Sequence, residues 1–319
     1  MSCVLAVDLG GTKAMAAVVD GAGVILGRGR SRIDARGDWS RVLGVIKEAI
    51  DQALESAGVP MDAVAGCGIG VPGPTDREAG VTRQMPNLDL FDVPVREDLT
   101  RHTGKPTTVE NDVDAGLLGE AWRGAAQGKR FVVGMFPGTG LGGAVMMDGR
   151  LHRGKTGITG EIGHMVMDPK GPQCGCGRRG CLEAYASRTA MEAWVGEQVK
   201  AGANTVLAKA GQPGARIGAR TFAKAVAAGD DLAIKCVKRT ATYIGLACAN
   251  AILLLSPEMI VLGGGVIEAL APSMMDRIRQ VAAKRCLPGC YDEIEIVEAQ
   301  CKDDAVVLGA ARAALDGLG

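Results

Sequence analysis

Residues 4–21 read VLAVDLGGTKAMAAVVDG, and residues 132–149 read VVGMFPGTGLGGAVMMDG. Each stretch contains an apolar segment, a glycine-rich turn, a second apolar segment and an Asp-Gly pair. This is the pattern of two β-strands joined by a glycine turn and followed by a tight turn. Similar patterns at matching positions indicate a duplication. We therefore predict an α/β protein of two related halves around a cleft, each half opening with a glycine hairpin.

The segments after each hairpin have the apolar patterns of further strands and helices. We expect strands at 65–74, 107–112, 259–266 and 293–299, and helices at 39–57, after 112, and at 181–199, 231–255 and 304–316. The last helix should pack back on the first half, so we predict a discontinuous first domain. That small N-terminal α/β domain comprises residues 1–114 plus 300–319, and residues 115–299 form the larger α/β domain.

The composition is that of a globular protein. Of 319 residues, 47% are hydrophobic and 23% are charged, and the formal net charge is zero. We expect neither nucleic acid nor a membrane as a partner, because zero net charge provides no electrostatic argument for either. No signal peptide and no apolar run of membrane-spanning length is seen. We therefore expect a cytoplasmic protein whose ten cysteines are thiols or metal ligands.

Two stretches match nucleotide-binding motifs literally but stand in the wrong context. Residues 138–143 (GTGLGG) have the G-x-G-x-x-G spacing, but a dinucleotide fold needs a helix next, and AVMMDG predicts a strand and a turn. Residues 149–156 (GRLHRGKT) have the Walker A spacing, but the following GITGEIGH is too rich in glycine for the required helix. We predict neither a Rossmann site nor a P-loop.

The motif DLGGTK (8–13) places a carboxylate at the end of a predicted strand, beside two glycines. Backbone N–H groups in such a turn can hold phosphate oxygens. Asp8 can bind Mg²⁺, which prefers one or two carboxylates plus water. The side chains of Thr12 and Lys13 add donors. This stretch is a candidate site for a phosphate compound with its magnesium ion.

A second carboxylate, Asp112, ends the predicted strand TTVEND and begins a predicted helix. An aspartate at this position can accept a proton from a substrate hydroxyl, and in phosphoryl transfer such a base mainly orients the nucleophile. The alternative is that Asp112 only caps the N-terminus of the helix, where Asp and Asn are favoured. Its position alone leaves both interpretations open.

A third cluster combines His164 with Cys174, Cys176 and Cys181. One histidine ten residues before a C-x-C-x₄-C segment supplies four ligands of the kinds that structural zinc prefers, in a closed tetrahedral site. Redox-active thiols are the alternative, although a thioredoxin-like site has C-x-x-C spacing. We expect structural zinc, bound within the larger domain. Glu183 lies two residues after Cys181, so whatever fixes Cys181 also fixes Glu183.

Taken together, these motifs resemble the ROK family, named for repressors, open reading frames and sugar kinases. The matching segments are DLGGTK (8–13), GVPGP (70–74), PNL (86–88), ENDVDAGLLGE (110–120), PGTGLGGA (137–144), GEIGH (160–164), CGCGRRGCLE (174–183) and VLGGGV (261–266). The resemblance covers nearly the whole chain. It implies the actin/hexokinase-type (ribonuclease H-like) ATPase fold, with two domains that arose by duplication.

The family resemblance also implies roles for individual residues. The implied ATP ligands are Asp8, Gly10, Gly11, Thr12 and Lys13 in the first hairpin, Gly138, Thr139 and Gly140 in the second, and Gly263, Gly264 and Gly265 near the adenosine. Asp112 is the implied catalytic base. The implied hexose ligands are Asn111, Asp112, Glu161, His164 and Glu183, with Gly73 and Asn87 as further candidates. His164 would use one ring nitrogen for zinc and the other for sugar.

These roles imply an ATP-dependent hexose kinase that uses magnesium and carries structural zinc. We expect transfer of the γ-phosphate to the 6-hydroxyl of glucose. Fructose, mannose, allose and N-acetylhexosamines are alternative acceptors, and polyphosphate is an alternative donor. A repressor or a non-catalytic sugar-sensing regulator is the other class, but the first strand begins by Val4 and leaves no room for a helix-turn-helix domain. We also expect a homodimer. Leu90-Phe91 stands where many members have Trp, which affects the rim of the sugar pocket.

Overall fold

The computed structural model describes residues 3–212 and 216–318. Contacts divide the chain into two compact units. Unit 1 comprises Met1–Gly128, Arg150–Thr159 and Gln300–Gly319, and unit 2 comprises Lys129–Gly149 and Gly160–Ala299. The boundary that we expected at residue 114 lies inside helix α3 (Asp112–Arg123), which belongs whole to unit 1. A helix is not divided between units because its hydrogen bonds run along its own length.

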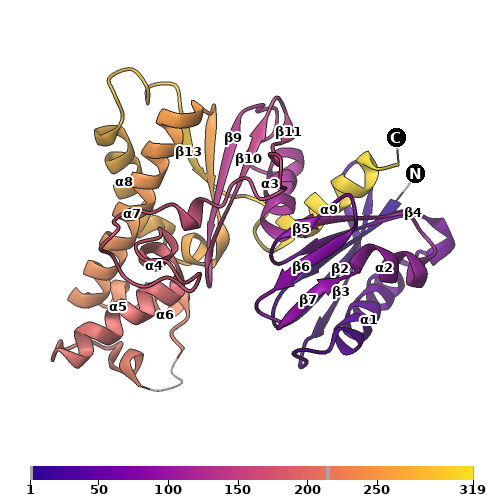
Figure 1. Cartoon of the computed structure of the whole chain (residues 1–319), viewed down its shortest axis with the longest axis horizontal. Coiled ribbons are helices and arrows are strands. Elements are labelled where there is room, and N and C mark those ends of the chain that lie inside the picture. Colours follow the sequence, from indigo (N-terminus) through magenta and orange to yellow (C-terminus); the bar gives the residue numbers. More distant parts are fainter. Residues whose placement is uncertain (1–2, 213–215, 319) are drawn as a thin grey trace. The chain divides into compact units, whose positions relative to one another are not determined.

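Unit 1 is built on a five-stranded sheet in the order β3-β2-β1-β4-β8 (Figure 1). Its strands are β1 (Cys3–Leu9), β2 (Lys13–Asp20), β3 (Ile25–Arg32), β4 (Val64–Val71) and β8 (Thr107–Asn111). β1, β2 and β3 pair antiparallel, as consecutive hairpins do, whereas β4 is parallel to β1 and β8 is parallel to β4. The carboxyl ends of β1, β4 and β8 therefore lie at the same edge of the sheet.

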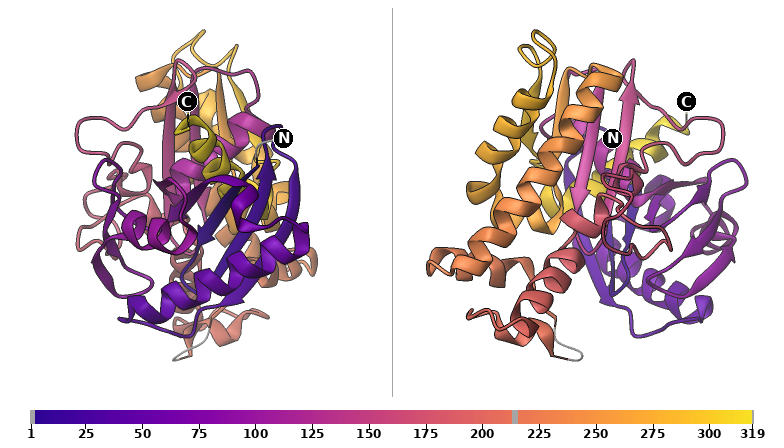
Figure 2. Two further views of the ribbon diagram at one scale, coloured as in Figure 1. Left: turned by 90° about the vertical axis from the view of Figure 1, so that its right-hand side faces the viewer. Right: turned by 60° about the vertical axis from the view of Figure 1, so that its left-hand side comes forward.

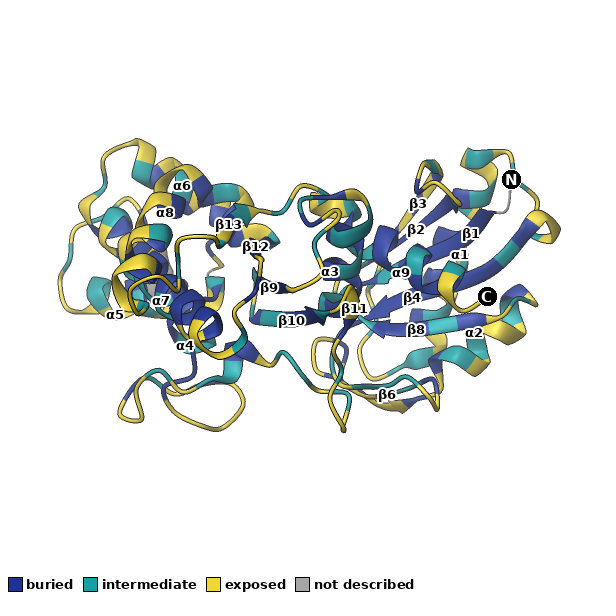
Figure 3. Cartoon of the chain, turned by 90° about the horizontal axis from the view of Figure 1, so that it is seen from above, coloured by how far each residue is buried: buried dark blue, intermediate teal, exposed yellow. Residues whose placement is uncertain are grey.

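Both faces of this sheet are covered, which explains why β1 and β4 are buried and lack alternation (Figure 3). One face packs on helix α1 (Trp39–Ala57) and the other on α9 (Ala305–Asp316). Within β1, Leu5 and Val7 face the α1 side, and Val4 and Ala6 face the α9 side. The last helix thus packs on unit 1, as predicted.

The remaining elements of unit 1 surround this sheet. Helix α2 (Val95–Thr103) precedes β8, and α3 follows β8 directly. A small antiparallel sheet of β5 (Thr75–Asp76), β6 (Val81–Met85) and β7 (Leu90–Val93) follows β4. Two 3₁₀ turns, η1 (Met61–Ala63) and η4 (Lys302–Asp304), complete the unit. We did not predict α2 or the small sheet, whose short and polar segments have weak periodicity.

Unit 2 is built on the second five-stranded sheet, in the order β11-β10-β9-β12-β13, which corresponds to β3-β2-β1-β4-β8. The edge strand β11 is Arg150–Leu151. The other strands are β9 (Val132–Pro137), β10 (Leu141–Met147), β12 (Met259–Leu262) and β13 (Glu295–Glu298). The long helices α7 (Asp231–Leu255) and α8 (Gly264–Arg285) run beside the sheet (Figure 2) and share its core. Helices α4 (Glu183–Ala186), α5 (Arg188–Lys200) and α6 (Ala219–Ala227) and 3₁₀ turns η2 (Ile162–His164) and η3 (Ala208–Gly211) complete unit 2.

Two expected elements of unit 2 are wrong in detail. The helix expected over 181–199 is divided, because Ser187 has extended backbone and its side chain caps α5 by accepting the N–H of Ala190. The strand expected over 259–266 ends at Leu262, and its last residues begin α8. We missed α8 because its first residues are glycines and Pro272 lies within it, and both residue types disfavour helix.

Residues 138–140 connect β9 to β10 and residues 141–143 already belong to β10, and no helix follows residues 149–156 before η2 in the described chain, so both motif rejections are confirmed. None of the helices in the described ranges combines the length and the hydropathy that crossing a membrane requires.

Helices α3 and α9 pack closely through glycine. A Cβ atom at Gly309 would lie 1.7 Å from the carbonyl oxygen of Ala115, and one at Gly119 would lie 2.1 Å from that of Ala305. Both neighbours are backbone atoms, which cannot rotate away. The two helices can therefore approach this closely only with glycine at the crossing.

We predict that Gly309→Ala lowers the free energy of unfolding by about 1–3 kcal/mol, the usual cost of overpacking. Gly44→Ala is the matched control, because Gly44 lies in α1 with no atom near its Cβ position. This control should stabilise the protein by roughly 0.5–1 kcal/mol, the difference in helix propensity. Urea denaturation of both variants measures the difference, and equal effects would contradict the packing argument.

Candidate functional site

In unit 1 the first glycine turn connects β1 to β2 and has Asp8 at its entrance. The turn is closed by a bond of 2.9 Å from the N–H of Gly10 to the carbonyl oxygen of Lys13. A Cβ atom at Gly11 would lie 2.7 Å from the Cβ of Asn87, so the Asn87 side chain packs directly on the turn. The Lys13 ammonium lies 3.8 Å from the Asp303 carboxylate. Sequence reasoning missed Asp303, which is brought here by the return of the chain after β13.

Helix α3 is capped by Asn111, the last residue of β8. The side-chain oxygen of Asn111 accepts the N–H groups of Val113 at 2.9 Å and of Asp114 at 3.2 Å. The side-chain amide of Asn111 donates to the carbonyl oxygen of Gly73 at 3.1 Å, which fixes the turn after β4. Asp112 is the first helical residue, so its carboxylate is not the N-cap. The Val113 N–H also lies 2.9 Å from Asp112 Oδ1.

Asp112 and Asp8 both have raised pKa values. Burial, with a smaller contribution from the charge of Asp8, raises the pKa of Asp112 to about 7. Burial also raises the pKa of Asp8 to about 6, against the opposing effect of the Lys13 ammonium. Such raised values are typical of functional carboxylates. Two carboxylates that resist ionisation in this way are suited to proton transfer and to binding a divalent cation.

Glu110, just before Asn111, forms a cluster of buried ion pairs that we did not predict from the sequence. Its side chain is 2% exposed, and it lies 2.6 Å from Arg77 Nε and 2.9 Å from Arg153 Nη2. Arg77 follows β5, and Arg153 belongs to the segment before GEIGH. The cluster therefore ties both segments to β8, beside Asp112. The partners are distant in sequence, so no local pattern could have paired them.

In unit 2 the second glycine turn, residues 138–140, joins β9 to β10. The Gly138 N–H donates to the carbonyl oxygen of Gly140 at 2.8 Å. The third glycine segment packs at the end of β9, because a Cβ atom at Gly264 would lie 2.8 Å from the carbonyl oxygen of Pro137. Gly264 also has φ of 75°, which favours glycine. The structure thus brings the second and third glycine turns together, as expected of parts of one site.

Glu183 lies between the glycine turn and the cysteine cluster. One carboxylate oxygen accepts the N–H of Leu141 at 2.8 Å, and the other lies 3.6 Å from Cys174 Sγ. A Cβ atom at Gly140 would lie 2.5 Å from the same carboxylate, so glycine is required there for this contact. We expected Glu183 only as a sugar ligand. The contact with the turn was not predictable, because it depends on how α4 packs against β10.

The GEIGH segment packs against the start of β10. A Cβ atom at Gly163 would lie 1.9 Å from the carbonyl oxygen of Leu141, which holds η2 close to the strand. Glu161 is exposed and His164 is half-buried. The two side chains approach to 3.9 Å, from His164 Nε2 to Glu161 Oε2. The other ring nitrogen of His164, Nδ1, lies 3.9 Å from Cys174 Sγ, so the two nitrogens face different partners.

The four predicted zinc ligands come together. The ligand atoms of His164, Cys174, Cys176 and Cys181 all lie within 4.8 Å of one another, and the sulfur atoms of Cys176 and Cys181 are 3.7 Å apart. Two sulfur ligands of one tetrahedral zinc ion, with bonds of about 2.3 Å, lie about 3.8 Å apart, which the Cys176–Cys181 separation matches. The backbone N–H of Arg178 lowers the pKa of Cys176 to about 6, whereas burial raises the pKa of Cys174 to about 12 and also raises that of Cys181. The donor set and its geometry fit structural zinc.

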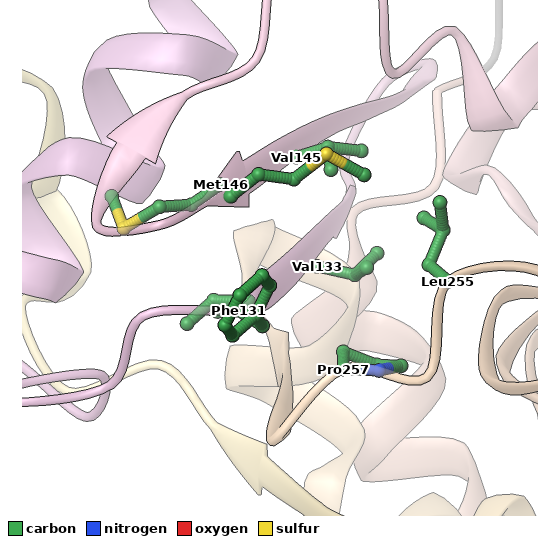
Figure 4. A pocket seen from close by; sticks show the side chains of 8 residues that line it. Phe131, Val133, Val145, Met146, Leu255 and Pro257 are labelled. Atoms are coloured by element: carbon green, nitrogen blue, oxygen red, sulfur yellow. The ribbon is translucent and has the colours of Figure 1, made fainter.

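A small apolar hollow in unit 2 lies apart from these residues (Figure 4). It is a shallow depression lined by Phe131, Val132, Val133, Val145, Met146, Met147, Leu255 and Pro257. No lining side chain is titratable or polar, so the hollow offers no group for catalysis.

The predicted site residues thus form one group in each unit. Unit 1 holds Asp8, Gly10, Gly11, Thr12, Lys13, Gly73, Asn87, Asn111 and Asp112, whereas unit 2 holds Gly138, Thr139, Gly140, Glu161, His164, the three cysteines, Glu183 and Gly263–Gly265. Within each group, side chains from distant segments meet at a glycine turn.

Known proteins are similar to this chain over nearly all of its residues. The chain is 35% identical over 309 residues to a glucokinase of Thermotoga maritima, covering 96% of this chain and 95% of that one. A ROK family glucokinase of Streptomyces griseus, solved with glucose and AMPPNP, superposes with a TM-score of 0.84 at 29% identity, covering 99% and 100% of the two chains.

A ROK family transcriptional regulator superposes with a TM-score of 0.86 at 30% identity, over 99% of this chain and 79% of that one. The ROK family itself matches over residues 4–316. The chain therefore has the two-domain actin/hexokinase-type fold, and it belongs to the ROK family.

Proposed function

We propose that this protein is an ATP-dependent hexose kinase that transfers the γ-phosphoryl group of ATP to the 6-hydroxyl of glucose. The observation that carries the proposal is the environment of Asp112. This carboxylate stands at the end of β8, is not used as the helix cap, and has a pKa raised to about 7 by burial. A base is most effective when its pKa lies near the working pH. The similarity to glucokinases of the family supports the assignment.

In this proposal Asp112 accepts the proton of the sugar hydroxyl as the phosphoryl group arrives. The transition state of phosphoryl transfer is loose, so Asp112 acts mainly by orienting the attacking oxygen. Asn111 binds the sugar beside it, and the Asn111–Gly73 bond keeps that segment in place. Asp8 would hold a magnesium ion, which offsets the phosphate charge when bound.

The glycine turns of the two units bind the ATP phosphates in this proposal. Residues Gly10–Lys13 and Gly138–Gly140 present backbone N–H groups, which suit phosphate oxygens. Glu161, His164 and Glu183 of unit 2 bind sugar hydroxyls. Zinc bound by the cysteine cluster holds His164 and Glu183 in a fixed relation and takes no part in bond breaking. It also stabilises the second glycine turn, because Glu183 contacts Leu141.

A panel of hexoses with ATP tests the proposal by coupled release of ADP. We expect the highest kcat/KM with glucose, measured against fructose, mannose, allose and N-acetylhexosamines. Polyphosphate in place of ATP tests the donor. If the protein bound a sugar but transferred no phosphoryl group, the kinase assignment would be wrong and a sugar-sensing regulator would be the better assignment. A transcriptional regulator is among the similar structures.

We predict that Asp112→Asn lowers kcat by about 10²–10⁴-fold and leaves the KM for glucose nearly unchanged, since the amide cannot accept the proton. In the wild type, kcat/KM should fall about tenfold for each pH unit below about 7, because protonation of Asp112 removes the base. Steady-state kinetics between pH 5 and 9 measure both effects. Near-normal turnover of the variant would exclude Asp112 as the base.

A stability measurement separates loss of the base from loss of the fold. The pKa of Asp112 is higher in the folded chain than in the unfolded chain, so its contribution to stability is present at low pH and is lost as pH rises through about 7. In magnesium-free buffer at pH 8, Asp112→Asn should therefore raise the melting temperature, and at pH 4 the difference should nearly vanish. A lower melting temperature at pH 8 would indicate damage to the structure instead.

We predict about one zinc ion per chain, measured by inductively coupled plasma mass spectrometry. Cys176→Ala should lose the zinc and lower the melting temperature by roughly 5 °C or more. It should weaken binding of both sugar and AMPPNP, because Glu183 contacts the second glycine turn. Cys290→Ala, at an exposed cysteine outside the cluster, is the control and should keep zinc and both affinities. Full activity of zinc-free protein would contradict the structural role.

A further inference from the structure

The first residues of helix α5 bind the second glycine turn through several hydrogen bonds. The N–H of Arg188 donates to the carbonyl oxygen of Gly138 at 2.9 Å, and the Thr189 hydroxyl donates to that of Thr139 at 2.8 Å. The Arg188 guanidinium donates to the Thr139 hydroxyl oxygen at 3.2 Å. A turn of glycine and threonine has many accessible conformations, and these bonds select one of them.

Arg188 itself is held in a fixed position. Its guanidinium pairs with Glu192 at 2.5 Å, one turn further along α5, and the side chains of Arg188 and Glu192 are only 19% and 15% exposed. Glu192 in turn accepts the N–H of Ile217 at 2.5 Å. Such a partly buried pair has lower mobility than a surface salt bridge, so the guanidinium is a rigid donor.

The direction of the bond between Arg188 and Thr139 determines what the threonine hydroxyl can do. A guanidinium can only donate, so the Thr139 oxygen accepts in this contact. The hydrogen of that hydroxyl stays available for an acceptor outside the turn. A phosphate oxygen is such an acceptor, and Thr139 is exposed at the tip of the turn.

We propose that Arg188 is a positioning residue for the phosphate-binding turn, and that it acts by orienting the Thr139 hydroxyl toward the phosphates of ATP. The proposal rests on the phosphate-binding role proposed for Gly138–Gly140. Arg188 lies outside the motifs singled out in the sequence, directly after the Ser187 cap. Its role becomes visible only when α5 is seen against the β9–β10 turn.

The test compares Arg188→Met, Arg188→Lys and Thr139→Val in the full chain. Arg188→Met should raise the KM for ATP and the Kd for AMPPNP about tenfold, the usual effect of losing one charge-assisted hydrogen bond, with the KM for glucose within about twofold of wild type. Arg188→Lys should recover part of the loss. Arg312→Met is the control, because Arg312 forms an i,i+4 ion pair with Asp316 in α9 that is remote in sequence from the turn.

A double-mutant cycle separates positioning from a general structural role. If Arg188 acts through Thr139, the double variant Arg188→Met/Thr139→Val binds AMPPNP no more weakly than Thr139→Val alone. Additive losses would overturn the proposal, as would an unchanged Kd for AMPPNP in Arg188→Met. AMPPNP binding also separates this inference from the proposed function. If wild-type protein bound AMPPNP but phosphorylated no sugar, the kinase proposal would be wrong. The AMPPNP affinities of the Arg188 variants would still test the role of Arg188.

Discussion

Asp8 and Asp112 are buried carboxylates at one edge of a sheet, where the charge of Asp8 makes ionisation of Asp112 less favourable. This repulsion follows directly from the parallel pairing of β1 with β4 and of β4 with β8, which places the carboxyl ends of these strands together. Burial of two carboxylates in this way lowers the free energy of unfolding at neutral pH. The surrounding structure tolerates the loss because α1 and α9 bury both faces of the sheet, and because Asn111 rather than Asp112 caps α3.

The duplication and the candidate site were largely predictable, because each has a local signature. Two hairpins with matching glycine turns and a histidine followed by C-x-C-x₄-C are patterns within short windows. The elements that escaped prediction lack such a signature. Helix α8 begins on glycine, and the small β5–β7 sheet consists of short polar strands. Contacts such as Glu110 with Arg153, or Glu183 with Leu141, join residues far apart in sequence and depend on tertiary packing.

Unit 2 concentrates its ligands around one turn. Glu183 contacts this turn and lies beside Cys174, while Nδ1 of His164 faces Cys174 and Nε2 faces Glu161. A metal ion in the cluster would therefore stiffen backbone that is otherwise rich in glycine. The residues of unit 2 proposed to bind sugar and those proposed to bind phosphate would then both depend on this metal site for their positions. In such an arrangement a change at the metal affects both substrates, even though neither touches the metal directly.

The packing of α9 also has a consequence for biosynthesis. β1 and β2 are translated before unit 2, but the residues that cover one of their faces, such as Val307 and Ala311, are translated after it. Unit 1 therefore cannot complete its core until α9 has been made, whereas the main segment of unit 2, residues 160–299, is continuous and is complete earlier. The nascent chain must carry an uncovered apolar sheet face until α9 has been translated, a state that favours chaperone binding.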